Sequence, residues 1–314
     1  MKNENKVKGF FYLIGFLIPL LILSFLCNRF YYHNRFPVKP EIARDTKTLI
    51  LGDSHAAFAL DPDIIGKAVN FSSYGESYIH NYYKLKYALK HNSSIKVIIL
   101  PIDIHSFSDF RKDRIHFTLN WYRFIDFIDL GWHKNQFVPY LLKYLNLSLF
   151  EFKGKYSRFF KDLFKKQGNQ KSTPFRYGFT PQEGFFFQQQ KEKARRRAYR
   201  QLRGYDYFCE ELVFYFKKIL NECEKNRIRV ILLKLPITEA YFTVVSQLIN
   251  VNHLYEQVFG LARQYKNIHS FDYQKLYFKN ESGLFWDPQH LNQTGARNIS
   301  TIIKNRLTEL HLIE

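Results

Sequence analysis

Short apolar runs separated by turns and helical patterns constrain the fold of this 314-residue chain more than any other feature. The first run, at 48–51, leads into Gly52-Asp53-Ser54-His55, which combines the glycine of a tight turn with side chains that begin helices. Strands that alternate with helices predict an α/β fold with a parallel sheet covered on both faces. The other predicted strands lie at 68–71, 96–100, 229–235 and 268–271, and the longest predicted helices at 77–92, 205–226 and 292–310.

The stretch between the third and fourth predicted strands interrupts this alternation. Residues 104–204 exceed what one crossover connection needs, so they predict a mostly helical insertion. Within it, residues 143–203 carry 16 Lys or Arg against four acidic residues, in a chain whose net charge is +19. Three interpretations of this basic insertion stay open: solvated helix faces, contact with an anionic membrane or polymer surface, and binding of nucleic acid.

An uncharged segment near the amino terminus predicts a membrane anchor. Residues 9–27 lack charged side chains, and at about 1.5 Å per residue such a helix just spans roughly 30 Å of hydrocarbon. A cleaved signal peptide competes with this interpretation, but the segment is long for one and lacks small residues at a processing site. The predicted organisation is a cytoplasmic N-terminus at 1–8, a transmembrane helix at 9–27, a linker at 28–46 and the α/β domain at 47–310. An exported protein tethered to a bilayer seldom meets nucleic acid, which disfavours that partner.

The spacing of cysteines and histidines limits the chemistry that is expected. Cys209 and Cys223 fall in one helical pattern, where fourteen residues separate them by about 21 Å. A disulfide needs roughly 4.4–6.8 Å between Cα atoms, so none is expected between these two residues. Cysteines and histidines also lack the spacing of zinc ligands, and the sequence predicts no metal and no cofactor.

A serine, a histidine and an aspartate have the positions that a nucleophilic triad needs. Ser54 follows the first predicted strand, and Asp287 and His290 lie three residues apart at the entry to the last helix. A serine hydroxyl becomes a good nucleophile when an imidazole takes its proton and a carboxylate fixes the tautomer of that imidazole. Each motif alone is also common in turns and helix caps. Their joint position favours catalysis, because parallel sheets bind ligands at the carboxyl ends of their strands.

Three blocks of the sequence resemble the SGNH, or GDSL-like, hydrolase superfamily. They are Gly52-Asp53-Ser54-His55, the segment 70–75 that ends with Gly75, and Asp287-Pro288-Gln289-His290. The resemblance implies a flavodoxin-like, three-layer α/β/α SGNH fold with about five parallel strands. It also implies that Ser54 is the nucleophile, His290 the base and Asp287 its partner. The backbone N–H groups of Ser54 and Gly75 are the implied oxyanion donors.

The third block departs from the family pattern. Hydrolytic members usually carry an asparagine after the third strand as a further oxyanion donor, whereas this chain has Pro101-Ile102-Asp103. An ionised Asp103 cannot donate a hydrogen bond, so no residue is assigned to the role of that asparagine.

This departure and the predicted anchor make the chain look most like the membrane-anchored branch of the superfamily, which includes alginate O-acetyltransferase-like proteins and proteins of teichoic acid D-alanylation. The resemblance implies a serine acyltransferase on the extracytoplasmic side of the cytoplasmic membrane. Its implied partners are an acylated donor, a cell-surface glycan that it O-acetylates and a multispanning membrane acyltransferase. The alternatives are an esterase with the same triad and a noncatalytic partner of such an acyltransferase.

Four further residues are candidates for supporting or substrate contacts. Asp53 and Asn70 are expected to brace the site. His55 is expected to contact substrate or to serve only in the turn. Trp286 is expected to stack on a sugar ring or to pack under its loop.

Overall fold

The computed structural model describes residues 8–9, 11–20, 22, 42–112, 178–184, 190–279 and 283–313. The chain divides into two compact units. One unit comprises Glu41–Phe124 and Arg176–Glu314, and the other comprises Met1–Pro40 and Ile125–Phe175. The first, here called the α/β unit, contains the sheet and all the predicted site residues.

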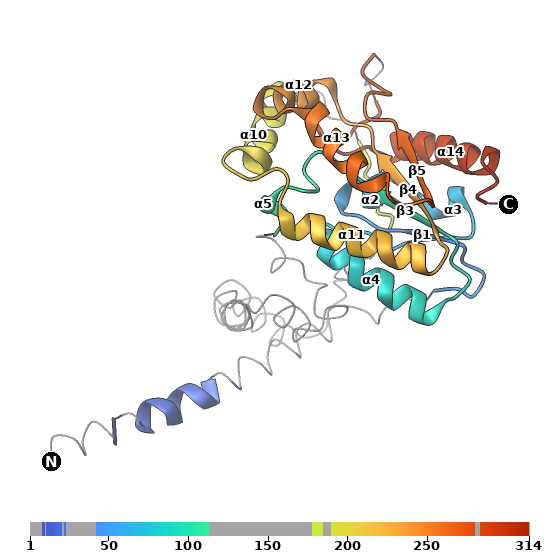
Figure 1. Ribbon diagram of the computed structural model, residues 1–314. Helices are drawn as coiled ribbons and strands as arrows, with labels where there is room; N and C mark the ends of the chain where they lie inside the picture. Colours follow the sequence, from blue (N-terminus) through green and yellow to red (C-terminus); the bar gives the residue numbers. More distant parts are fainter. Residues whose placement is uncertain are drawn as a thin grey trace, which may run out of the picture. The chain divides into compact units, whose positions relative to one another are not determined.

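Among the described residues, a five-stranded sheet forms the centre of the α/β unit (Figure 1). Its strands pair in parallel in the order β2-β1-β3-β4-β5, which fits a flavodoxin-like fold. The predicted α/β fold with a parallel sheet is therefore confirmed, and each strand overlaps a predicted run. The strands are β1 (Thr48–Ile50), β2 (Ala68–Asn70), β3 (Val97–Pro101), β4 (Arg229–Lys234) and β5 (Ile268–Asp272).

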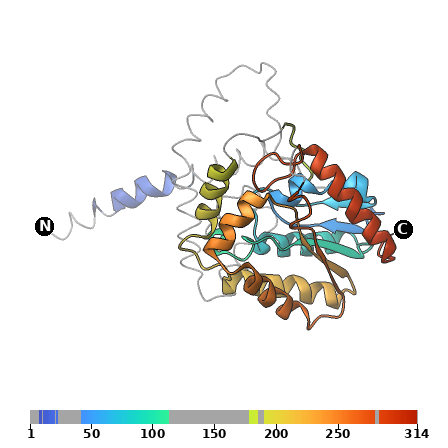
Figure 2. The ribbon, with the colours of Figure 1, turned by 90° about the horizontal axis from the view of Figure 1, so that it is seen from above.

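Helices connect the strands and cover both faces of the sheet. On one face, α4 (Tyr78–His91) packs against α11 (Glu210–Lys225). On the other, α14 (Gln293–Glu309) packs against the short helices α2 (Ser54–Ala59) and α3 (Pro62–Ile65). Figure 2 shows α14 and α11 on opposite sides of the sheet. The three longest of these helices lie where the sequence predicts helices.

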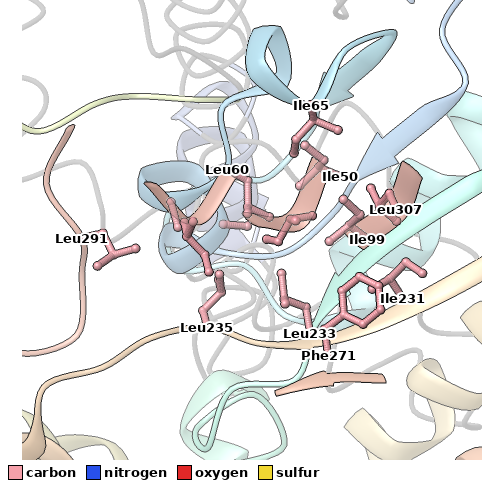
Figure 3. Close-up of a cluster of buried hydrophobic side chains, with 14 of the residues drawn as sticks. Ile50, Leu60, Ile65, Ile99, Ile231, Leu233, Leu235, Phe271, Leu291 and Leu307 are labelled. Carbon is pink, nitrogen blue, oxygen red and sulfur yellow. The ribbon is translucent and has the colours of Figure 1, made fainter. Parts of the chain in front are cut away.

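Side chains from the strands and from α14 form a buried hydrophobic cluster on one face of the sheet (Figure 3). Ile50, Ile99 and Ile231 occupy neighbouring strands and are fully buried in this cluster. Because successive strand residues point to opposite faces, the equally buried Leu49 and Ile98 point to the other layer. Burial on both faces explains why the central strands β1, β3 and β4 are mostly continuous apolar runs in the sequence. Helix α14 supplies Ile299, Ile303 and Leu307 to this cluster, and the short helices α2 and α3 add Ala56, Ala59 and Ile65.

Only part of the predicted insertion at 104–204 can be compared with the structure. Its described elements are α5 (Asp109–Lys112), the segment 178–184 and α10 (Gln190–Leu202). Residues 113–177 and 185–189, and with them most of the basic stretch, lie outside the described residues.

Helix α10 carries most of the described Lys and Arg residues of the basic insertion. It packs against α12 (Glu239–Leu248), which follows β4 and precedes α13 (Val251–Ala262). Ala194 and Ala198 are fully buried, so small side chains mark the face of α10 that meets the rest of the α/β unit.

The prediction of a transmembrane anchor at 9–27 is wrong. Among the residues described, no helix has the length and apolar character that crossing a membrane requires. The cytoplasmic N-terminus at 1–8 and the extracytoplasmic placement of the domain depended on this helix and are withdrawn with it. The linker predicted at 28–46 lies mostly outside the described residues.

Candidate active site

The turn after β1 presents Ser54 at the start of α2. Gly52 has a φ of 129°, and a Cβ at this position would lie 2.9 Å from the Cβ of Ala56, so glycine is required. Asp53 caps α2, because its Oδ1 accepts a hydrogen bond from the backbone N–H of His55 at 2.8 Å. The Ser54 side chain is half-buried in this turn and remains accessible.

A tight loop before α14 holds the other two triad residues. Asp287 Oδ1 accepts hydrogen bonds from the backbone N–H groups of Gln289, at 2.8 Å, and His290, at 3.1 Å. The backbone N–H of Trp286 donates to the carbonyl oxygen of His290 at 2.9 Å and closes the loop. With Oδ1 committed to the backbone, Oδ2 of Asp287 faces the imidazole ring.

The structure brings Ser54, His290 and Asp287 into one hydrogen-bonded chain. The Ser54 Oγ lies 2.9 Å from His290 Nε2, although 236 residues separate the two. His290 Nδ1 lies 2.8 Å from Asp287 Oδ2. In this arrangement the Nδ1–H group donates to the carboxylate, and Nε2 accepts the hydrogen bond of the serine hydroxyl.

The electrostatic environment keeps this chain in the protonation state of a general base. Burial opposes the ionisation of Asp287, but His290 and Arg197 outweigh it and hold the pKa of the carboxyl below its usual value. Burial lowers the pKa of His290 to about 4, against the opposing effect of Asp287. At neutral pH Asp287 is therefore ionised and His290 is neutral, with a lone pair on Nε2.

Asp53 anchors a buried polar cluster behind the nucleophile. Its Oδ2 accepts hydrogen bonds from His105 Nε2, at 2.9 Å, and from the guanidinium of Arg111 on α5. Burial opposes the ionisation of Asp53, but the Arg111 charge and the His105 hydrogen bond hold its pKa well below the usual value. These contacts fix the turn that carries Ser54 to the neighbouring elements.

His55 and Asp103 form a second buried pair beside the triad. His55 Nδ1 lies 3.4 Å from Asp103 Oδ2, and the ring centroids of His55 and His290 are 4.9 Å apart. Burial opposes protonation of His55, but Asp103 outweighs it and raises the pKa of His55. Burial likewise raises the pKa of Asp103. The residue in the place of the third-block asparagine is thus a buried carboxyl group that faces an imidazole.

Asn70 lies at the end of β2 and braces the helix that begins with the nucleophile. Its Nδ2 donates to the carbonyl oxygens of Ala56, at 3.1 Å, and Leu60, at 2.8 Å. The loop that follows lies against the nucleophile turn, because the backbone N–H of Ser73 donates to the carbonyl oxygen of Gly52 at 3.4 Å. Asn70 therefore acts on the site through the backbone.

This same loop carries the predicted oxyanion donor Gly75. Gly75 is half-buried with a φ of 74°, which glycine adopts without strain. The fully buried Lys84 of α4 donates to the carbonyl oxygen of Phe71 and to Oε2 of Glu76, both at 2.5 Å. Lys84 thus fixes the loop on both sides of Gly75, by a hydrogen bond to Phe71 and an ion pair with Glu76.

Aromatic side chains border the imidazole of the triad. The ring centroid of Phe58 lies 4.7 Å from that of His290, 4.9 Å from that of Tyr74 and 5.8 Å from that of Trp286. Phe58 is buried, whereas Tyr74 and Trp286 are 39% and 40% exposed. The site therefore opens onto a partly exposed aromatic surface, here called the aromatic rim, formed by Tyr74 and Trp286 over Phe58.

The sequence did not predict the two arginines that contact the acids of the site. Arg111 binds Asp53, and Arg197 Nη1 lies 2.9 Å from Asp287 Oδ2. Arg197 stood out only as part of a basic run. One further feature of the sequence points weakly to a buried contact of Arg197. It directly precedes Ala198, one of the small residues on the buried face of α10.

The described residues include cysteines, histidines and carboxylates outside the triad. Among them, no group of three or more His, Cys, Asp or Glu side chains is arranged to hold a metal ion. Cys209 and Cys223 are buried free thiols. The chemistry that this site offers is a nucleophile, a base and an acid that orients the base.

Comparisons with known proteins add a distant structural likeness. No family model and no curated protein matches the sequence. Among solved structures, the chain is similar to a Streptococcus pneumonia protein described as "a putative platelet activating factor", at 13% sequence identity and a TM-score of 0.45. The match covers 94% of this chain and 98% of that one. A likeness at this level carries no argument about fold or activity.

Proposed function

We propose that the protein is an SGNH-type serine acyltransferase that forms an acyl-serine at Ser54 and passes the acyl group to a hydroxyl group. The observation that carries this proposal is the chain from Ser54 Oγ through His290 to Asp287, with links of 2.9 and 2.8 Å. The β2-β1-β3-β4-β5 strand order and the three sequence blocks support the SGNH assignment and its three-layer fold.

In the first half-reaction, Ser54 Oγ attacks the carbonyl carbon of an acyl ester while its proton passes to His290 Nε2. Ionised Asp287 stabilises the imidazolium that this transfer creates. The bond to the leaving alcohol then breaks, and His290 returns the proton to the alcohol oxygen. In the second half-reaction, the acceptor hydroxyl loses its proton to His290 and attacks the carbonyl carbon of the acyl-serine. The ester bond to Ser54 Oγ then breaks, and His290 returns the proton to Ser54 Oγ, which restores both residues.

The oxyanion of each tetrahedral intermediate requires donors that are already in place. The backbone N–H groups of Ser54 and Gly75 are the proposed donors, because one begins α2 and the other lies in a loop fixed by Lys84. Such preorganised donors typically contribute about 3–4 kcal/mol each. Asp103 faces His55 and is not assigned to this role.

The acceptor is proposed to be a sugar hydroxyl. The aromatic rim supports this choice, since half-exposed Trp286 and Tyr74 offer ring faces on which a sugar can stack next to His290. If water reaches the acyl-serine instead, the same residues make the protein an esterase. Proton transfer is identical in both cases, so the acceptor has to be identified by experiment.

The test uses the purified full chain, a fluorophosphonate probe and a chromogenic acetyl ester. Wild type is expected to be labelled at Ser54, and Ser54→Ala to lose labelling and roughly 10³-fold or more of the ester turnover. Ser93→Ala is the matched control, because Ser93 is an exposed serine in the turn after α4. Circular dichroism confirms that each variant is folded.

The time course of alcohol release from the chromogenic ester distinguishes a sugar hydroxyl from water as the acyl acceptor. A burst of alcohol release, slow turnover and acceleration by added oligosaccharide support transfer to a sugar. Rapid turnover that oligosaccharides leave unchanged supports an esterase. If folded wild type is not labelled by the fluorophosphonate and does not cleave the acetyl ester, the protein is not a serine acyl-transfer enzyme. A binding role then replaces the proposal.

A further inference from the structure

Arg197 reaches the triad from a helix of the basic insertion. Its Nη1 lies 2.9 Å from Asp287 Oδ2, 3.2 Å from His290 Nδ1 and 3.3 Å from Gln289 Oε1. Asp287 Oδ2 is also the atom that accepts from His290 Nδ1, at 2.8 Å. The guanidinium and the imidazole therefore converge on one carboxylate oxygen.

The position of Arg197 is fixed by the way α10 is held. Gln201, one helical turn further along α10, exchanges hydrogen bonds with the side chain of Gln289, at 2.9 and 3.3 Å. The Tyr241 hydroxyl of α12 donates to the same amide of Gln201 at 2.8 Å, and Ser108 donates to its backbone carbonyl at 2.9 Å. These buried contacts join α10 to the loop between Asp287 and His290. The backbone of Arg197 is therefore held near Asp287 by contacts that its own side chain does not make.

Several charged groups surround the imidazole of His290. Asp287 faces it from its own loop, Arg197 from α10 and His55 from α2. Asp103 faces His55 and Arg200 lies near Arg197 on α10, while Arg111 balances Asp53. Of these groups, Arg197 is the permanent cation in contact with both members of the His290–Asp287 pair.

We propose that Arg197 is a positioning residue of the triad, which holds the Asp287 carboxylate toward His290 and keeps the imidazole unprotonated as the acceptor of the Ser54 proton. A guanidinium 3.2 Å from Nδ1 disfavours a positive charge on the His290 ring by repulsion. Because the guanidinium also pairs with Asp287, it weakens the attraction between that carboxylate and an imidazolium. His290 therefore stays unprotonated, and able to accept the Ser54 proton, in mildly acidic solution. Burial and Arg197 act in the same direction on the pKa of His290.

The first test measures His290 directly. Side-chain NMR of the histidine-labelled full chain, with His290→Gln to assign the signal, gives the titration midpoint of the ring without any substrate. In Arg197→Gln the midpoint is expected to rise by about one pH unit or more, because a contacting like charge has been removed. Arg197→Lys keeps the charge and is expected to restore most of the wild-type midpoint.

The matched control is Arg196→Gln. Arg196 precedes Arg197 on α10, is 77% exposed and pairs with Glu192, so the variant removes the same charge without touching the triad. Its midpoint is expected to equal that of wild type. A shift as large as that of Arg197→Gln would assign the effect to the net charge of α10 and overturn the proposal.

The second test carries the inference into the reaction and rests on the proposed function. The rate of fluorophosphonate labelling of Ser54 is expected to fall with acid at the NMR midpoint of each variant. An unchanged midpoint in folded Arg197→Gln, with only a lower melting temperature, shows that Arg197 merely packs α10 and refutes the proposal. If Arg197→Gln does not fold, Arg197→Met, which keeps the aliphatic stem, is titrated in its place and is judged by the same outcomes.

Lack of labelling in wild type contradicts the proposed function. The NMR titration, which needs no substrate, still decides the role of Arg197.

Discussion

Gly295, in the first turn of α14, is a position where one added methyl group tests how the loop that carries His290 is held. A Cβ there would lie 2.3 Å from the carbonyl oxygen of Leu284 and 2.9 Å from Leu291 Cδ2. The oxygen belongs to the backbone and accepts a hydrogen bond from the N–H of Asn292 at 2.9 Å, so it cannot simply rotate away. Because Leu284 and Leu291 flank the loop that carries His290, Gly295→Ala is expected to displace the base.

The size of this effect follows from two opposing contributions. Overpacking typically costs about 1–3 kcal/mol, and a clash with backbone belongs near the upper end. Alanine regains roughly 1 kcal/mol relative to glycine as a helix former, which leaves a net loss of about 1–2 kcal/mol in the free energy of unfolding. A shift of about 1 Å in a catalytic group lowers a rate by roughly 10²-fold. Gly295→Ala is thus expected to lose more activity than stability.

Urea unfolding and the rate of Ser54 labelling by a fluorophosphonate measure the two effects. Gly260→Ala is the matched control, since Gly260 lies in α13 with nothing within 4 Å of the added Cβ. That variant is expected to gain about 0.4–1 kcal/mol of stability and to be labelled at the wild-type rate. If Gly295→Ala is as stable as wild type and is labelled equally fast, the reasoning that links α14 to the base is wrong.

Two further predictions concern buried charges. Lys84→Met removes the cation that pairs with buried Glu76 and is expected to lower the free energy of unfolding by about 3–5 kcal/mol. Lys86→Met, at an exposed position of α4, is the control and is expected to leave urea unfolding unchanged. Equal stability of the two variants would contradict the assigned ion pair. For His290, the folded pKa of about 4 lies below the unfolded value of roughly 6.5, so the unfolded state binds more protons. Stability is therefore expected to fall as the pH drops from about 6.5 toward 4, and in His290→Gln this part of the pH dependence, measured by thermal unfolding, should disappear.

Apolar runs and local motifs were the part of the sequence that could be interpreted correctly. The central strands β1, β3 and β4 are short and buried on both faces, so their composition alone marks them, as in Ile98-Ile99-Leu100. The contact between His290 and Asp287 spans three residues of one loop and follows from spacing. The membrane prediction at 9–27 failed, because no helix among the described residues has the length and apolar character that a span requires.

By itself, the sequence determined the five strands, three of the longer helices and the local pairing of Asp287 with His290, because these features depend on neighbours along the chain. It nominated Ser54 as the third member of the candidate triad, but only the tertiary structure brings Ser54 to His290, 236 residues away. The tertiary structure alone decided which charges surround that triad. Arg197 meets Asp287, Arg111 meets Asp53 and Lys84 meets Glu76 only after packing has chosen which helix faces meet. No local period encodes such pairs, since the same arginine or lysine on an unpacked helix would simply remain in water.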